Sequence, residues 1–203
     1  MHPLEAKHPV GTGRMTHRCL ANSDLWVGAD FAECPKVNAL LSDPSVYPVL
    51  LFPSPSSVDL SSLEPAARVD VFPKDREPVL IVLDGTWRLA KKMLFHSPNL
   101  QKLPQVCFKP SRLSQFKVRK QPNDLCFSTI EAVHEFLSLL SPSDRPQPHD
   151  HLLEVFHEMV AKQLSFRTKG GNSGRHSQSY LARKARRAKW RALREELARQ
   201  TGA

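Results

Sequence analysis

Apolar residues follow two patterns along this chain, continuous short runs and helical repeats. The continuous runs predict short strands at residues 49–52, 79–83, 106–108 and 125–127. Apolar residues at helical spacing predict helices at residues 87–94, 130–140 and 152–164. Pro98 and Pro142 are expected to end the first two of these helices. Strands that alternate with helices indicate an α/β fold, with a largely parallel sheet flanked by helices.

The run at residues 79–83 is apolar at every position, which is typical of a parallel strand covered on both faces. Asp84 follows it directly. In open α/β sheets ligands bind beyond the carboxyl ends of the strands, and a carboxylate there can serve as a general base. The alternative is that Asp84 only caps the next helix, because Asp is a common N-cap residue.

The segment from residue 125 to residue 132 repeats the change from strand to helix. On a functional interpretation, Ser128 and Thr129 face a ligand across from Asp84. On the structural interpretation, Ser128 and Glu131 form a capping box at the start of a helix. The residues alone favour the capping box.

Charge is distributed unevenly. The formal net charge is +9, and residues 162–203 hold twelve Lys/Arg against two Glu, so this segment alone carries +10. The rest of the chain is close to neutral. A basic arm on a neutral body favours a polyanion such as nucleic acid, and the alternative is a solvated helix. We expect a catalytic domain at residues 1–166 and a basic, flexible or helical tail at residues 167–203.

Cysteine usage argues against a zinc ribbon and against a disulfide scaffold, because the four cysteines lack CxxC spacing: Cys19, Cys34, Cys107 and Cys126. A reducing, cytoplasmic setting fits, and the absence of a long apolar run predicts no membrane span. Without a leader of charged, then apolar, then small residues, we expect no signal peptide. His149, His151 and His157 are candidate metal ligands, but no Cys or carboxylate set completes a site, so no metal is predicted.

Several motifs occur together and in order. They are HPLE and TGRM between residues 2 and 15, LFPSPSS at 51–57, Asp84-Gly85-Thr86-Trp87, FKVRKQ at 116–121, and Ser128-Thr129-Ile130-Glu131-Ala132. Over about residues 1–166 the chain resembles the DTW-domain family of tRNA-uridine aminocarboxypropyltransferases. The D-x-T-W and S-T-x-E-A signatures carry most of this resemblance.

The resemblance implies a SPOUT-like, knotted fold that binds S-adenosylmethionine. It implies transfer of the 3-amino-3-carboxypropyl group to N3 of a uridine in tRNA, with methylthioadenosine as the other product. Family members of this type begin with a cysteine-rich segment, which is absent here, so no N-terminal metal site is carried over. The oligomeric state stays open, with a monomer favoured.

The resemblance also implies roles for particular residues. Asp84 is the expected general base. The residues expected to bind the cofactor are Leu51, Phe52, Pro53, Ser54, Leu83, Gly85, Thr86, Trp87, Leu125, Cys126, Ser128, Thr129 and Glu131. Glu131 caps its helix or meets the cofactor's amino group. The residues expected to hold tRNA phosphates are Arg14, Arg112, Lys117, Arg119, Lys120, Arg183, Lys184, Arg186, Arg187 and Lys189.

Two other functions remain open at this point. A SPOUT-type RNA methyltransferase would share the fold and the cofactor but would release S-adenosylhomocysteine. A non-catalytic RNA-binding relative would bind tRNA, and replacing Asp84 would leave its binding unchanged.

Overall fold

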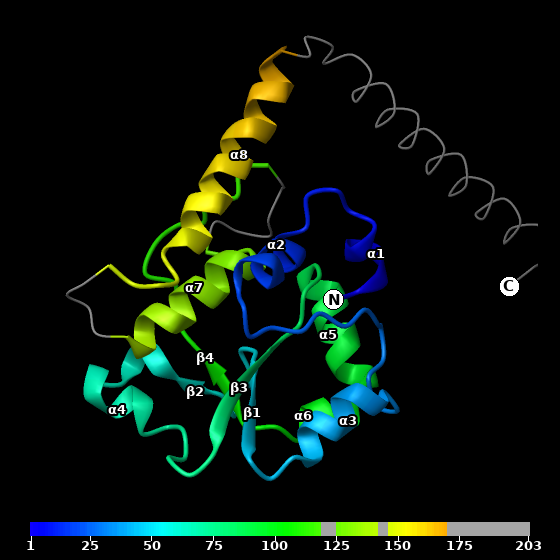
Figure 1. Cartoon of the computed structure of the whole chain (residues 1–203), viewed down its shortest axis with the longest axis vertical. Coiled ribbons are helices and arrows are strands. Elements are labelled where there is room, and N and C mark those ends of the chain that lie inside the picture. Colours follow the sequence, from blue (N-terminus) through cyan, green and yellow to red (C-terminus); the bar gives the residue numbers. More distant parts are fainter. Residues whose placement is uncertain (119–124, 142–145, 170–203) are drawn as a thin grey trace, which may run out of the picture. The chain divides into compact units, whose positions relative to one another are not determined.

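The structure of the protein, a computed structural model, describes residues 1–118, 125–141 and 146–169. The chain divides into two compact units, Met1–Ala161 and Lys162–Ala203, and the first contains every described strand. Its helices and strands are shown in Figure 1, in the order α1 (Pro3–Ala6), α2 (Thr12–Cys19), α3 (Pro35–Ser42), β1 (Val46–Leu51), β2 (Val58–Asp59), η1 (Leu60–Ser62), α4 (Pro65–Val69), β3 (Glu77–Val82), α5 (Trp87–His96), α6 (Pro98–Gln101), β4 (Gln105–Cys107), α7 (Thr129–Leu140) and α8 (His151–Lys169).

The four strands form one parallel sheet in the order β2-β4-β1-β3. β1 lies inside the sheet and pairs with β3 over six residues, from Val46 opposite Glu77 to Leu51 opposite Val82. The prediction of a parallel sheet flanked by helices is therefore confirmed. Because all strands run in one direction, the ends of β1 and β3 open onto the same edge, which is where Asp84 lies.

Helices cover both faces of the sheet (Figure 1). Successive residues of β1 point to opposite faces, so Leu50 joins a core with Met93 of α5 and Val37 of α3. Val49 joins a second core, with Phe136 of α7. These two clusters make a helix–sheet–helix arrangement that holds the ends of the strands in place.

Most of the predicted elements are confirmed. The helices predicted near residues 87–94, 130–140 and 152–164 are present as α5, α7 and α8. The strands predicted at 49–52 and 106–108 are present as β1 and β4. No helix in the described ranges has the length and apolar character that crossing a bilayer requires.

One of the four predicted strands is absent, and another lies at the edge of the sheet. The run at 79–83 is the parallel strand β3, whose apolar residues are half-buried, with Ile81 packed against one core and Leu80 against the other. Its first residues, Glu77 and Pro78, are typical of an edge strand. Residues 125–127 form no strand. Phe127 instead packs its ring against Phe108, with centroids 6.1 Å apart, whereas Leu125 is exposed.

Candidate active site

Asp84 lies just beyond β3 and is 7% exposed. The hydroxyl of Thr129, the first residue of α7, donates a 2.5 Å hydrogen bond to Oδ1 of Asp84. The other carboxylate oxygen, Oδ2, is buried and has no hydrogen-bond partner among the described residues. A buried polar atom without a partner needs a physical explanation. Here Thr129 holds one oxygen of the carboxylate, and the other is buried without a hydrogen bond from the described residues.

The alternative interpretation of Asp84 as a helix cap is wrong. The N-cap of α5 is Thr86, whose Oγ1 accepts a hydrogen bond from the backbone N–H of Leu89 at 3.3 Å. Asp84 is therefore not needed to start the helix. Its carboxylate turns to α7 instead.

Aromatic side chains lie at the same edge of the sheet. Phe52 follows β1 and Trp87 begins α5, and their rings meet edge to face with centroids 6.1 Å apart. Phe52 is buried, whereas Trp87 is 37% exposed. The ends of β1 and β3 and the start of α5 thus converge, and Thr129 joins them through Asp84.

The remaining predicted cofactor residues differ in how well they fit this edge. Leu51 ends β1, and Ser54 donates its backbone N–H to Ser57 Oγ at 3.1 Å. Pro53 is exposed, and Leu83 and Gly85 are half-buried beside Asp84. Leu125 is 53% exposed and Cys126 is half-buried.

Gly13 of α2 approaches the Asp84 carboxylate closely, and the sequence analysis gave it no role. A Cβ added to Gly13 would lie 2.5 Å from Asp84 Cγ and 2.6 and 2.8 Å from its two oxygens. Such distances are far inside normal contact. The absence of a side chain at Gly13 therefore lets α2 cover Asp84, and the TGRM motif was the sequence signal for this contact.

Replacing Gly13 with Ala tests this packing. The new methyl group must displace the Asp84 carboxylate, and misplacing a catalytic group by about 1 Å can cost about a hundredfold in rate. We expect Gly13→Ala to lower the turnover of tRNA by about tenfold to a hundredfold. Gly11→Ala is the matched control, because its nearest atoms lie 3.7 and 3.8 Å away. Equal activity of the two variants, measured as kcat/KM, would contradict this packing.

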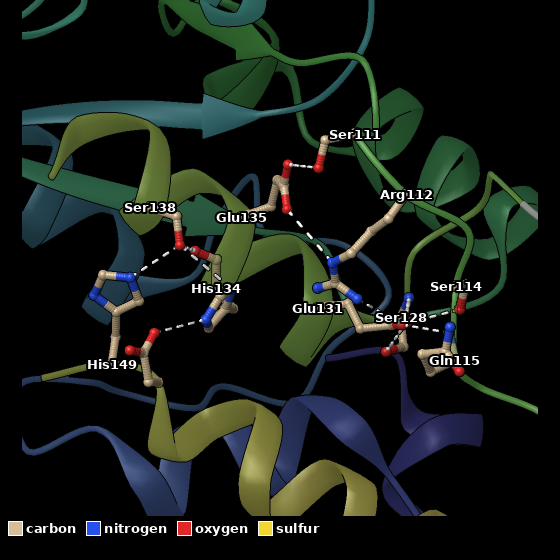
Figure 2. A network of polar contacts seen from close by, with 11 residues as sticks. Ser111, Arg112, Ser114, Gln115, Ser128, Glu131, His134, Glu135, Ser138 and His149 are labelled. Atoms are coloured by element: carbon tan, nitrogen blue, oxygen red, sulfur yellow. Dashed lines mark hydrogen bonds and ion pairs between the residues drawn. The ribbon is translucent and has the colours of Figure 1, made fainter. Parts of the chain in front are cut away.

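Glu131 is fully buried and accepts hydrogen bonds from four donors (Figure 2). Its Oε2 accepts from the backbone N–H of Ser128 at 2.9 Å, from Ser128 Oγ at 2.6 Å and from Ser114 Oγ at 2.8 Å. Its Oε1 accepts from the backbone N–H of Gln115 at 2.8 Å. The predicted capping box is confirmed. The same carboxylate also fastens the segment around residues 114–115 to α7.

Arg112 lies between two carboxylates of α7 (Figure 2). Its guanidinium is 3.9 Å from Glu131 Oε1 and 3.9 Å from Glu135 Oε2, and it stacks 5.1 Å above the Phe127 ring. Glu135 also accepts a hydrogen bond from Ser111 Oγ at 2.7 Å. The charge of Arg112 is therefore used within the protein.

The other predicted phosphate-binding residues lie in different settings. Arg14 donates to the backbone carbonyl of Ala6, so its guanidinium is also engaged internally. Lys117 is exposed. The remaining ones lie outside the described residues: Arg119, Lys120, Arg183, Lys184, Arg186, Arg187 and Lys189.

The histidines form a cluster different from the one considered from sequence. His149 lies with His134 and Asp150, and the candidate ligand atoms of these three residues are within 4.8 Å of one another. Among the described residues this is the one group that could hold a metal ion. Hydrogen bonds account for it: His134 Nε2 is 3.2 Å from Asp150 Oδ1, and Ser138 Oγ is 3.0 Å from His149 Nε2. These contacts join α7 to the start of α8.

His149 and His151 have opposite pKa shifts. Burial, followed by the nearby charge of His134, lowers the pKa of His149. Carbonyl oxygens of Cys19 and Pro148, at 2.9 and 2.6 Å from the His151 ring nitrogens, raise the pKa of His151. Both ring nitrogens face acceptors, so the doubly protonated ring is favoured.

These shifts predict an order of titration. We expect His149 to protonate below the ordinary value of about 6.5 and His151 above it. Since the folded pKa of His149 is lowered, its contribution to stability is lost as pH falls below 6.5. The folded pKa of His151 is raised, so the contribution of His151 to stability is present at low pH. This contribution is lost as pH rises through the folded pKa. Ring-proton NMR titration measures both values, and the reverse order would contradict the assignment.

Comparisons with known proteins identify relatives of this chain. The family model described as "DTW domain" matches residues 1–164. A Drosophila melanogaster protein named tRNA-uridine aminocarboxypropyltransferase 2 is 32% identical over 168 residues, which are 80% of this chain and 62% of the relative. A Mus musculus protein of the same name is 29% identical over 185 residues, 90% of this chain and 58% of the relative.

The chain spans about three fifths of the length of the curated relatives it matches. No solved structure matches it. The family model covers most of the chain, including the residues around Asp84 and Thr129. This chain belongs to the DTW-domain family.

Proposed function

We propose that this protein transfers the 3-amino-3-carboxypropyl group of S-adenosylmethionine to N3 of a uridine in tRNA and releases methylthioadenosine. The family and the names of its relatives support the class of reaction. The observation that carries the proposal is the asymmetric environment of Asp84. Thr129 holds Oδ1, while the buried Oδ2 has no hydrogen-bond partner among the described residues.

Asp84 acts as the general base in this proposal. A uridine N3 carries a proton and is a poor nucleophile until that proton leaves. S-adenosylmethionine, when bound, supplies a sulfonium that activates the aminocarboxypropyl carbon. Asp84 Oδ2 accepts the N3 proton as the bond from N3 to this carbon forms and the bond from carbon to sulfur breaks. No metal ion is needed for this step.

Access to Asp84 requires movement of the covering segment. Oδ2 is buried, and α2 lies against the carboxylate at Gly13. Substrate binding therefore has to displace part of α2, and the target base has to leave its stack. Exclusion of water by the same segment strengthens the interactions of the carboxylate with bound groups.

The residues proposed to bind the cofactor lie at the carboxyl edge of the sheet. Backbone groups at residues 51–54 and 83–87, with Ser128 and Thr129, would hold the adenosine and methionine parts. We also propose that Leu125 and Cys126 contact the cofactor. We assign Glu131 to its four donors within the protein and not to the cofactor's amino group, because its carboxylate is fully buried.

The SPOUT-like fold, the knot and tRNA binding by the basic tail also belong to this proposal. The parallel sheet flanked by helices supports the fold. A charge of +10 over residues 162–203 supports a role for the tail.

The small-molecule product tests the proposed reaction. The full chain is incubated with unmodified tRNA and S-adenosylmethionine, and the nucleoside products are separated by chromatography. We expect methylthioadenosine, formed only when tRNA is present. Release of S-adenosylhomocysteine would identify an RNA methyltransferase instead. Binding of tRNA with neither product would identify a non-catalytic relative.

A further inference from the structure

Helix α5 exposes an aromatic and basic face that the sequence analysis did not assign to tRNA. Its exposed residues include Trp87, Arg88, Lys91, Lys92 and Phe95, and we call these five residues the α5 face. At 3.6 residues per turn they fall within an arc of about 140°. The opposite side of the helix carries Ala90 and Met93, which pack in the core.

The α5 face carries three cations and no acidic residue. No acidic residue occurs from residue 85 to residue 105. None of its three cations is paired with a carboxylate among the described residues. Three cations elsewhere in this unit are paired with carboxylates: Arg112 with two glutamates, Lys74 with Asp70 at 3.4 Å and Lys109 with Asp59 at 3.5 Å.

The two apolar side chains on this face are both aromatic and exposed. Phe95 is 75% exposed and Trp87 is 37% exposed. They are separated by about 12 Å along the helix axis, at 1.5 Å per residue. Exposed aromatic rings interleaved with cations suit a nucleic-acid strand, because bases stack on the rings while phosphates meet the cations.

The α5 face also begins at the proposed catalytic carboxylate. Thr86 caps the helix and Trp87 starts it, directly after Asp84 and Gly85. A strand lying along the face would therefore pass Asp84 at the N-terminal end of α5. The side chains of Arg14 and Arg112, by contrast, are used inside the protein.

We propose that the α5 face binds the tRNA strand next to the target uridine. Arg88, Lys91 and Lys92 contact its phosphates, and Trp87 and Phe95 stack on unpaired bases. This inference rests on the proposed function for the identity of the polyanion. Charge complementarity and the aromatic spacing select RNA over an acidic protein as the occupant.

The test removes the three charges together. The triple variant Arg88→Gln, Lys91→Gln, Lys92→Gln is compared with Lys36→Gln, Lys74→Gln, Lys109→Gln, which loses the same charge from exposed positions elsewhere. The affinity of each full chain for unmodified tRNA is measured across a range of salt concentrations. Thermal unfolding confirms that both triple variants are folded.

We expect the α5 variant to bind tRNA at least tenfold more weakly at about 0.1 M salt. The slope of log affinity against log salt concentration should decrease in magnitude by about two to three, close to one for each phosphate contact. For the control triple variant, this slope should decrease by less than about one. Equal slopes for the two triple variants would overturn the proposal. The proposal would also be overturned if the three substitutions weakened binding of an acidic protein and left the affinity for tRNA unchanged.

The binding measurement is independent of the reaction. If the unmodified chain forms no product but the α5 variant loses tRNA affinity, the α5 face stands and the proposed reaction fails. If the unmodified chain modifies tRNA and the α5 variant binds and modifies it equally well, the reaction stands and the α5 face fails. Failure of the unmodified chain to bind tRNA would overturn both.

Discussion

An Asp84→Asn variant is expected to keep its fold and its affinity for tRNA and to lose aminocarboxypropyl transfer by about a hundredfold to ten-thousandfold. The amide oxygen can still accept the 2.5 Å hydrogen bond from Thr129, so the position of the side chain is preserved. The amide cannot take up the N3 proton. A loss of rate would therefore reflect the loss of the general base and not a change in the packing around residue 84.

Single-turnover rates with saturating S-adenosylmethionine measure this loss, because they isolate the chemical step from product release. Asp70→Asn is the matched control, since Asp70 is exposed and paired only with Lys74 in the described structure. It removes the same charge from the surface. A rate for Asp84→Asn within twofold of the unmodified chain, with Asp70→Asn unchanged, would exclude Asp84 as the base.

Glu131→Gln is expected to destabilise the fold by about 3 kcal/mol. Glu131 accepts four hydrogen bonds in a fully buried position, and its charge also faces Arg112. Glutamine keeps the size of the side chain but turns one acceptor into a donor. That donor meets Ser128 or Gln115, whose backbone N–H groups then lack an acceptor.

Urea unfolding measures the change in the free energy of unfolding. Glu135→Gln is the matched control on the same helix, because Glu135 accepts one hydrogen bond from Ser111 and also faces Arg112. We expect it to cost about 1 kcal/mol. Equal losses for the two variants would show that the contacts of Glu131 to residues 114–115 add nothing to stability.

Local patterns predicted the elements of this fold well. Helical spacing identified α5, α7 and α8, and the pair Ser128 and Glu131 identified the capping box, because these signals act over a few residues. The position of β3 was not predictable in this way. An apolar run shows that a strand is buried to some degree, but the order of strands depends on connections across the whole unit.

Local patterns also indicated only part of the candidate site, because several of its contacts join residues far apart in the chain. The residues alone favoured the capping box over the interpretation in which Ser128 and Thr129 face a ligand across from Asp84. The structure contains the capping box and also joins Thr129 to Asp84 by a hydrogen bond. The contact of Gly13 with Asp84 depends on how α2 folds over the sheet, which no local pattern contains. Arg112 was predicted to hold phosphate as part of a basic loop. Its contacts with Glu131 and Glu135 were not predictable, because no local pattern links residues so far apart in the chain.

The most direct measurement is the mass of the nucleosides from tRNA incubated with the full chain and S-adenosylmethionine. We expect a uridine heavier by one 3-amino-3-carboxypropyl group, absent when Asp84→Asn replaces the unmodified chain. A nucleoside heavier by one methyl group, or tRNA that is bound but unchanged, would contradict this expectation.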